Sequence, residues 1–492
     1  MRLLSPSVFF ALASIVACGG SVASSAPEPK PDTPPVAQPT PGPIASSEPK
    51  APKAPSPVAP TSCSAPLPAL ACATEAPAPT KADDVRKFVA ANAVRLRCAE
   101  GDAALWDFSP LVSLYGQQKM FMVGEAHGSN EIGLVSALIF ETLASRRLVN
   151  VLGMELPMDY EAPLQRYVDT GSDPTGEQVV EQLAPNMFGS ILPKAARKLV
   201  VSGLPIRVAA VDIPTDPNFA LKELQQLVAK LDTQKEAALA VLPKTLGRPP
   251  SASEITQANG FYDAAVAKQA EICTELSADD CDRFVAMFHA LWASTTQYGA
   301  EPDAEWFMRR EVAIYANMRA KMRTNADRMF LHMGAFHTNK FEASAGSRMA
   351  KEYPLTKGQV FSLAPAYGQG STIWYGEDVS VPPSPPNVAK GLADATDLPM
   401  FVSATRPSAA CVQNPIGIEG DEDVGVGGLR GELYDGFIYY GRLTSEQEPD
   451  QATLSSKGNV TGKALRAFRD RMRAKETAAL RSGLLRTAHP GR

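Results

Sequence analysis

The chain has 492 residues, of which 45% are hydrophobic and 21% are charged, and this is the composition of an ordinary globular protein. Its formal net charge of -5 gives no electrostatic basis for binding nucleic acid, so we expect no nucleic-acid partner. Beyond the extreme N-terminus, no apolar run approaches the roughly 20 residues that a membrane-spanning helix needs.

The N-terminus has the pattern of an export signal. Arg2 precedes the apolar stretch Leu3 to Val16, which is too short to span a bilayer and ends in small residues before Cys18. Residues 15–18 resemble the lipobox of bacterial lipoproteins, in which the cysteine becomes the lipidated first residue; an ordinary signal peptide cleaved nearby is the alternative. Gly19 stands where an aspartate often retains lipoproteins in the inner membrane. We predict a signal peptide over 1–18, a membrane anchor at Cys18, and a location at the outer membrane or cell surface.

A disordered linker is predicted over residues 19–82. This region holds 17 of the 42 prolines, all between Ser21 and Thr80, and scarcely any aromatic residue. Such a segment cannot bury enough apolar surface to offset the entropy of ordering, so we expect an extended, semi-rigid spacer.

Six cysteines remain if Cys18 carries lipid, and an even number in an exported protein permits disulfides. Cys273 and Cys281 are close enough in sequence to close a small loop. Cys63 with Cys72 could close another, which leaves Cys98 and Cys411 as a long-range pair. Six cysteines allow fifteen pairings, so other connectivities stay open.

Residues 83–445 are predicted to form one α/β domain. Strand-length runs that are apolar on both faces alternate with segments of helical spacing, which indicates a mainly parallel central sheet flanked by helices. The runs are Lys119 to Val123, Val149 to Glu155, Ile206 to Asp212, Arg328 to His332, Gln359 to Leu363 and Tyr434 to Tyr440. Residues 218–325 show only helical patterning and should form a helical insertion or lid. Residues 446–492 should form a basic helical tail.

Unusual polar residues stand where four of these strands end, and ligands of parallel α/β sheets bind beyond the carboxyl ends of strands. These candidates are Glu125, His127 and Glu131 after the first run, Glu155 and Asp212 ending the next two, and His332 with His337 after the fourth. A structural role is the alternative for some of them. Glu155 could pair with Arg310, Asp212 is as easily structural as catalytic, and His332 could be a core histidine. His127 and His337 differ because each follows a Gly-x-x-His arrangement, in which glycine permits a tight turn and the imidazole can face the crevice.

Gly124-Glu125-Ala126-His127-Gly128, followed by Glu131, resembles the Gly-Glu-x-x-His-Gly-x-x-Glu signature of the erythromycin esterase family, one residue shorter. The paired Gly-x-x-His motifs resemble those of the wider superfamily that includes the Tiki and TraB proteins and the ChaN-type haem-uptake lipoproteins. Arg310-Glu311 is similar to the Arg-Asp helix of the esterases. Where the esterases carry a further histidine before the second motif, this chain has Gly334.

The mechanism we predict is hydrolysis of an ester (lactone) or amide bond in a small molecule or peptide. His127 would take a proton from water, with Glu155 or Glu125 orienting its ring, while His337 and Arg310 would polarise the carbonyl. Glu131, Asp212 and His332 would support them. The sequence has no Gly-x-Ser-x-Gly elbow, which disfavours a covalent serine nucleophile.

Two alternatives use the same residues. Glu125, His127, Glu155 and His337 form a plausible set of ligands for zinc, manganese or iron, and the Tiki-like resemblance implies a metal-dependent peptidase. The ChaN-type resemblance implies instead that the crevice binds haem or a metal without catalysis. Separately, nine basic residues from Lys463 onward could contact anionic lipid or polysaccharide, although a solvated helix explains them as well.

Overall fold

The computed structural model describes most of the chain between residues 86 and 445, and the described residues belong to one compact unit. The predicted signal peptide, linker and tail lie outside the described residues, as do Cys63, Cys72 and Cys411. The ranges described are 86–87, 89–90, 93–100, 103–116, 118–183, 191–298, 303–340, 343–374, 377–381, 383–384, 386–395, 399–403, 405–407, 413–415 and 433–445.

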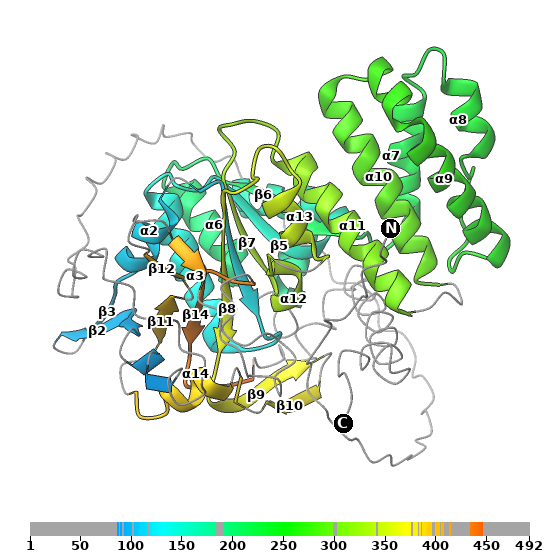
Figure 1. Ribbon diagram of the computed structural model, residues 1–492. Helices are drawn as coiled ribbons and strands as arrows, with labels where there is room; N and C mark the ends of the chain where they lie inside the picture. Colours follow the sequence, from blue (N-terminus) through cyan, green and yellow to red (C-terminus); the bar gives the residue numbers. More distant parts are fainter. Residues whose placement is uncertain are drawn as a thin grey trace, which may run out of the picture. The chain divides into compact units, whose positions relative to one another are not determined.

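The centre of the fold is an eight-stranded sheet in the order β1-β11-β14-β8-β4-β7-β5-β6 (Figure 1). All neighbours from β14 to β6 pair in parallel, and β11 runs antiparallel to both β1 and β14. The strands are β1 (Val94–Arg95), β4 (Met120–Glu125), β5 (Val151–Pro157), β6 (Arg207–Asp212), β7 (Met329–Gly334), β8 (Val360–Ala366), β11 (Met400–Ser403) and β14 (Gly436–Tyr439). The six parallel strands coincide with the six predicted runs, and the predicted α/β class with a mainly parallel sheet is confirmed.

Strand β7 lies between β4 and β5, although a long helical segment separates it from both in the sequence. It pairs Gly334 with Glu125 on one side and His332 with Met154 on the other. Every residue of β4, β5 and β7 is buried, which explains why these strands are apolar on both faces. This order places three of the predicted strand ends next to one another.

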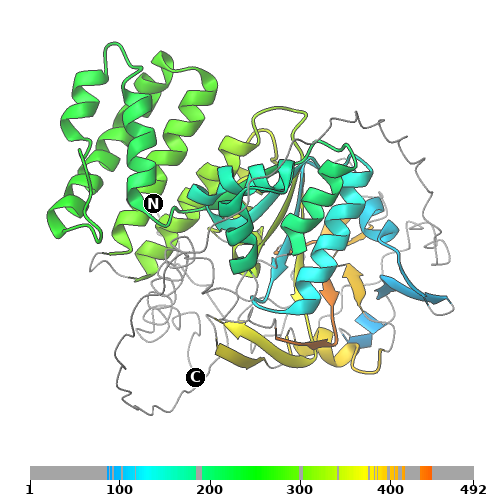
Figure 2. The same ribbon diagram turned by 180° about the vertical axis from the view of Figure 1, so that it is seen from behind.

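Helices cover both faces of the sheet (Figures 1 and 2). Along β4, Phe121 and Val123 belong to one buried core, with α3 (Asn130–Ser145) and α6 (Ile191–Val201). Met120 and Met122 belong to another core, with α11 (Asp303–Lys321) and α13 (Ala345–Lys351). The side chains therefore alternate between two apolar layers, as the period of a strand requires. Two more helices, α4 (Glu161–Thr170) and α5 (Pro174–Leu183), follow β5.

The segment between β6 and β7 is helical, as predicted. Besides α11 it contains α7 (Pro217–Val228), α8 (Lys235–Val241), α9 (Ala252–Glu275) and α10 (Ala278–Thr296). Helix α10 packs against α7, α9 and α11 around a separate apolar core. The predicted disulfide between Cys273 and Cys281 is confirmed and joins the end of α9 to the start of α10. Helix α11 also packs against β6, so one helix links this segment to the sheet.

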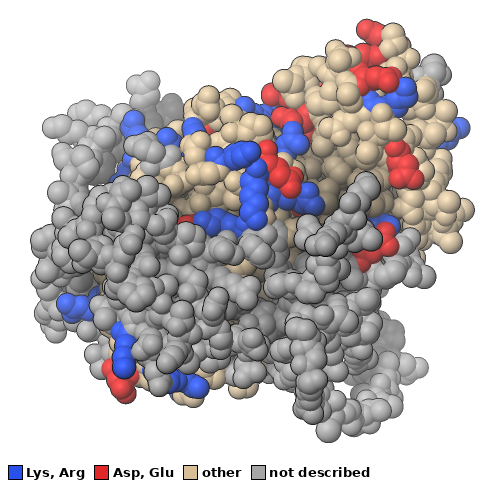
Figure 3. Space-filling model, viewed as in Figure 1, with Lys and Arg blue, Asp and Glu red and all other residues tan. Residues whose placement is uncertain are grey.

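Several short elements carry too weak a periodicity to be predicted from sequence. They are β2 (Arg97–Glu100), β3 (Ala103–Trp106), α2 (Ser109–Tyr115), η1 (Met158–Tyr160), α12 (Ala335–Thr338), β9 (Gln369–Trp374), β10 (Glu377–Val381), α14 (Pro386–Gly391), β12 (Thr405–Pro407), β13 (Gln413–Pro415) and β15 (Arg442–Leu443). Within the described ranges, no helix is both long enough and apolar enough to cross a bilayer. On the described surface that Figure 3 shows, basic and acidic side chains lie beside one another.

Candidate functional site

The parallel sheet brings all but one of the predicted site residues together at the carboxyl ends of β4, β5, β6 and β7. Glu125, Glu155 and Asp212 come from the first three of these strands, and His332 from the fourth. His127 follows β4, His337 lies in α12 after β7, and Arg310 reaches the cluster from α11. Glu131 lies elsewhere. It accepts hydrogen bonds from the backbone N–H (2.8 Å) and hydroxyl (2.6 Å) of Thr444, and so joins the start of α3 to the end of β15.

Glu125 joins two histidines. Its Oε1 lies 2.7 Å from Nδ1 of His127, and its Oε2 lies 2.9 Å from Nε2 of His332. Burial on its own would raise the pKa of Glu125, but the charges of His332 and His127 and their hydrogen bonds outweigh it and lower the pKa. An ionised carboxylate only accepts hydrogen bonds, so each imidazole presents an N–H to it. His127 therefore presents Nδ1–H to Glu125, and in the neutral form of the ring its Nε2 would be the basic nitrogen.

Arg310 holds the two other strand-end carboxylates. Its Nε and Nη2 each donate to Asp212 at 2.9 Å, a bidentate pair, and Nη2 also donates to Oε1 of Glu155. The second oxygen of Glu155 accepts the backbone N–H of Gly334 at 2.8 Å. Arg310 is completely buried, so its guanidinium is committed to this ion-pair network.

His337 lies between two carboxylates. Nδ1 contacts Oε1 of Glu311, and Nε2 lies 3.3 Å from Oε1 of Glu155. Burial lowers the pKa of His337, but the charges of Glu311 and Glu155 outweigh it and raise the pKa to about 10. Burial raises the pKa of Glu155, but the positive charges of His337 and Arg310 outweigh it and hold that pKa well below its ordinary value. His337 is therefore an imidazolium at neutral pH, paired through Nδ1 with Glu311 and through Nε2 with Glu155, and its Nε2 also lies 3.3 Å from Nη1 of Arg310.

Glu311 was not among the residues predicted for the site. It is completely buried on α11, and its second oxygen accepts the backbone N–H of Ala345 at 2.8 Å, at the start of α13. No strand end marks it in the sequence. The sequence feature that could have pointed to Glu311 is its position directly after Arg310, in a dipeptide that resembles the Arg-Asp pattern of the esterases.

The glycines of both Gly-x-x-His motifs permit close approach of backbone to side chain. A Cβ on Gly334 would lie 2.8 Å from Nε2 of His127 and 3.4 Å from Oε2 of Glu155. A Cβ on Gly124 would lie 2.8 Å from the Thr338 hydroxyl. A side chain at either position would press against a neighbouring group, so glycine is required at both.

The residues at this site do not fit a metal ion. Over the described ranges, no group of three or more His, Cys, Asp or Glu side chains is arranged to hold one. The two oxygens of Glu125 form hydrogen bonds with His127 and His332. The two oxygens of Glu155 accept hydrogen bonds from Arg310 and from the backbone N–H of Gly334. The carboxylates thus act as hydrogen-bond acceptors within the protein.

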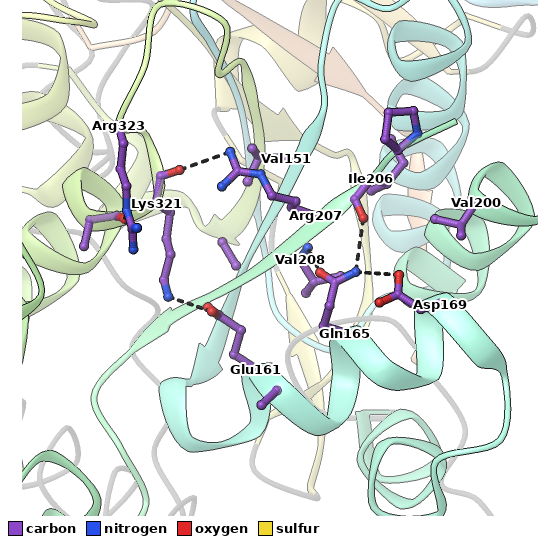
Figure 4. A pocket seen from close by; sticks show the side chains of 14 residues that line it. Val151, Glu161, Gln165, Asp169, Val200, Ile206, Arg207, Val208, Lys321 and Arg323 are labelled. Atoms are coloured by element: carbon purple, nitrogen blue, oxygen red, sulfur yellow. Dashed lines mark hydrogen bonds and ion pairs between the residues drawn. The ribbon is translucent and has the colours of Figure 1, made fainter. Parts of the chain in front are cut away.

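A cleft of about 610 Å³ lies at the opposite edge of the sheet, where β5 and β6 begin (Figure 4). Its polar side chains bond mainly to the protein itself. Glu161 of α4 accepts the N–H of Ala210 at 3.0 Å, and Lys321 donates to Glu161 at 2.6 Å. Gln165 accepts the N–H of Val208 at 2.6 Å and donates to the Ile206 carbonyl at 3.2 Å. The cleft has no His, Cys, Met or Tyr in its lining that could ligate a haem iron, and the strand-end cluster lies at the other end of the strands.

Solved structures share the fold of this chain, but no comparison shows the family to which it belongs. No family model matches the chain, and no curated protein matches it. A Bacillus cereus protein of solved structure is 16% identical, with a TM-score of 0.53, over 76% of this chain and 100% of that one. A succinoglycan biosynthesis protein is 12% identical, with a TM-score of 0.51, and the match covers 75% of this chain and 98% of that protein. An erythromycin esterase mutant in its open conformation is 14% identical, with a TM-score of 0.51, and the match covers 70% of this chain and 96% of the esterase. At the level of fold, the resemblance to the erythromycin esterases inferred from the motifs is confirmed.

Proposed function

We propose that this chain is a hydrolase in which His127 activates water for attack on an ester (lactone) or amide bond. The observation that carries the proposal is the 2.7 Å pair between Nδ1 of His127 and the ionised Glu125. Of the predicted site histidines, His127 is also the most exposed, at 8%, against 4% for His337 and 0% for His332. The fold shared with an erythromycin esterase supports the choice of reaction class.

In the proposed reaction, Nε2 of His127 removes a proton from water as the water oxygen bonds to the carbonyl carbon. The carboxylate of Glu125 fixes the ring tautomer and stabilises the imidazolium that forms. The carbonyl oxygen becomes an oxyanion, which the positive charge of His337 stabilises. Collapse of the tetrahedral intermediate breaks the bond to the leaving group, and Nε2 of His127 returns the proton to that group.

The network around Arg310 gives it a different role from the one predicted from sequence. Since the guanidinium is buried and bonds to Asp212 and Glu155, we assign it to positioning rather than to the substrate carbonyl. It fixes the surroundings of Nε2 of His337 both through Glu155 and directly, since its Nη1 lies 3.3 Å from that nitrogen. Asp212 and His332 likewise hold partners in place, Arg310 and Glu125 respectively.

A panel of ester, lactone and amide substrates tests the function on the full-length chain. We expect His127→Ala to lower kcat/KM by about 10² to 10⁴, the usual contribution of a general base. His489→Ala is the matched control, a histidine outside the described residues, and should retain full activity. Hydrolysis that persists undiminished in His127→Ala would refute the assignment. Metal and haem content, measured on the same preparation, tests the two alternatives.

We also propose that the enzyme works at the outer membrane or cell surface, anchored by lipid on Cys18. The lipobox-like run and the proline-rich segment after it support this location. Incorporation of radiolabelled palmitate should occur in the wild type and disappear in Cys18→Ser. Labelling that is equal in both would show that the chain is exported without a lipid at this residue.

A further inference from the structure

We infer that Phe307 and Phe336 form an aromatic wall of the substrate site and select esters or amides with a flat apolar group beside the scissile bond. This inference rests on the proposed function and names the substrate class that the site favours.

The two rings meet although they belong to different elements. Phe307 lies on α11, one turn before Arg310, and Phe336 lies in α12, directly before His337. Their centroids are 4.9 Å apart and their planes are inclined by 64°, an edge-to-face contact. The two elements that carry the positioning arginine and the site imidazolium therefore also present adjoining aromatic surfaces.

Both rings pack around His337. The centroid of Phe307 is 5.9 Å from that of His337, with planes 24° apart, and Phe336 lies at 5.8 Å with planes 86° apart. An aromatic face near 6 Å from a cation favours the charged form electrostatically. A group bound against these rings would thus lie next to the imidazolium that we propose as the oxyanion partner.

Phe307 and Phe336 are more exposed to solvent than most of the phenylalanines whose side chains the structure describes. His337 is buried, but Phe307 and Phe336 are only half-buried and keep part of their apolar surface in water. Of the phenylalanines whose side chains the structure describes, Phe219 is the only other one that is not buried. Apolar surface beside a few fixed polar groups is the usual makeup of a small-molecule site. A phenyl or similar flat group would cover this surface and gain the free energy of its burial.

The test compares ethyl acetate with ethyl phenylacetate, which differ by one phenyl group on the acyl side. Hydrolysis is followed in a pH-stat with the full-length chain, and binding is followed separately by saturation-transfer NMR with His127→Ala. The double variant Phe307→Leu/Phe336→Leu keeps apolar bulk but removes both rings. Phe219→Leu, on α7, is the matched control.

We expect the wild type to prefer ethyl phenylacetate and the double variant to lose roughly tenfold of that preference, since aromatic contacts typically contribute such a factor. Phe219→Leu should leave the preference unchanged. A preference that survives the double substitution, or equal NMR binding of the phenyl group with and without the rings, would overturn the inference. If no ester is hydrolysed, the proposed function fails while the binding experiment still decides whether the wall exists. If His127→Ala abolishes hydrolysis but the rings have no effect, the wall alone is refuted.

Discussion

Gly334 lies so close to His127 that a methyl group on it would stand 2.8 Å from Nε2, the nitrogen to which we assign the proton transfer. The glycine comes from the end of β7 and the histidine follows β4, and the two strands pair directly. The second Gly-x-x-His motif thus shapes the space around the histidine of the first.

Substitution of Gly334 should therefore impair catalysis more than folding. In Gly334→Ala the new methyl group must push the His127 ring aside, and we expect kcat/KM to fall by about 10²-fold, since misplacement of a catalytic group by about 1 Å has this effect. Gly260→Ala on α9 is the control, because a Cβ there meets nothing within 4 Å. The control should keep full activity and unfold at an equal or higher denaturant concentration. Full activity of Gly334→Ala would contradict the arrangement.

Removal of the charge at Glu125 should lower kcat and leave KM nearly unchanged. Glu125→Gln keeps the side-chain shape but cannot stabilise the His127 imidazolium, so we expect a loss of at least about 10²-fold in kcat. Steady-state kinetics measures the effect. Glu131→Gln is the matched control, since Glu131 belongs to the same motif but bonds to Thr444. Equal losses in the two variants would show that the motif acts as a structural unit.

His337 should remain protonated throughout the neutral range. Its pKa is raised to about 10 by Glu311 and Glu155, above its ordinary value of 6.5. The sign follows from this shift: the favourable contribution to folding is complete below pH 6.5 and is lost as the pH rises through about 10. NMR at pH 8 should show two ring N–H protons on His337, and Glu311→Gln should lower the pKa. A neutral ring at pH 8 would contradict the positive charge by which we propose that His337 stabilises the oxyanion.

Arg310 should be essential for stability. Arg310→Met leaves Glu155 and Asp212 buried without their partner, and breaking a buried pair in this way costs about 3–5 kcal/mol of unfolding free energy. Denaturant unfolding measures it. Arg166→Met, which breaks the surface pair with Asp173, is the control and should cost no more than about 1 kcal/mol. A small effect at Arg310 would mean that water enters the cluster and solvates the two carboxylates.

The sequence was sufficient to locate the parallel strands and most of the site, because fully buried strands are apolar throughout and their polar ends stand out. It could not show that β7 enters between β4 and β5, since strand order depends on contacts between distant segments. For the same reason it left open whether Glu125 or Glu155 orients His127, and the structure places Glu125 on Nδ1.

Arg310 and Glu311 illustrate the other limit. Two neighbours on a helix point about 100° apart, yet both reach the cluster, Arg310 through Glu155 and Glu311 through His337. The pattern of α11 gives no sign of this, because a buried ion pair depends on partners that other segments supply. The role predicted for Arg310 was to polarise the substrate carbonyl, and we assign it to positioning instead because its guanidinium is buried and bonds to Asp212 and Glu155.

The last strand of the sheet, β6, has two of its outward N–H groups, those of Val208 and Ala210, bonded to side chains of α4. A strand with bare N–H groups at the border of a sheet is a template on which another chain can add, and proteins commonly block such strands with charge or proline. Here Glu161 and Gln165 take the N–H groups of Ala210 and Val208, as a neighbouring strand would. Helix α4 therefore protects this border from pairing with another chain at two positions, and unfolding of α4 would expose both N–H groups.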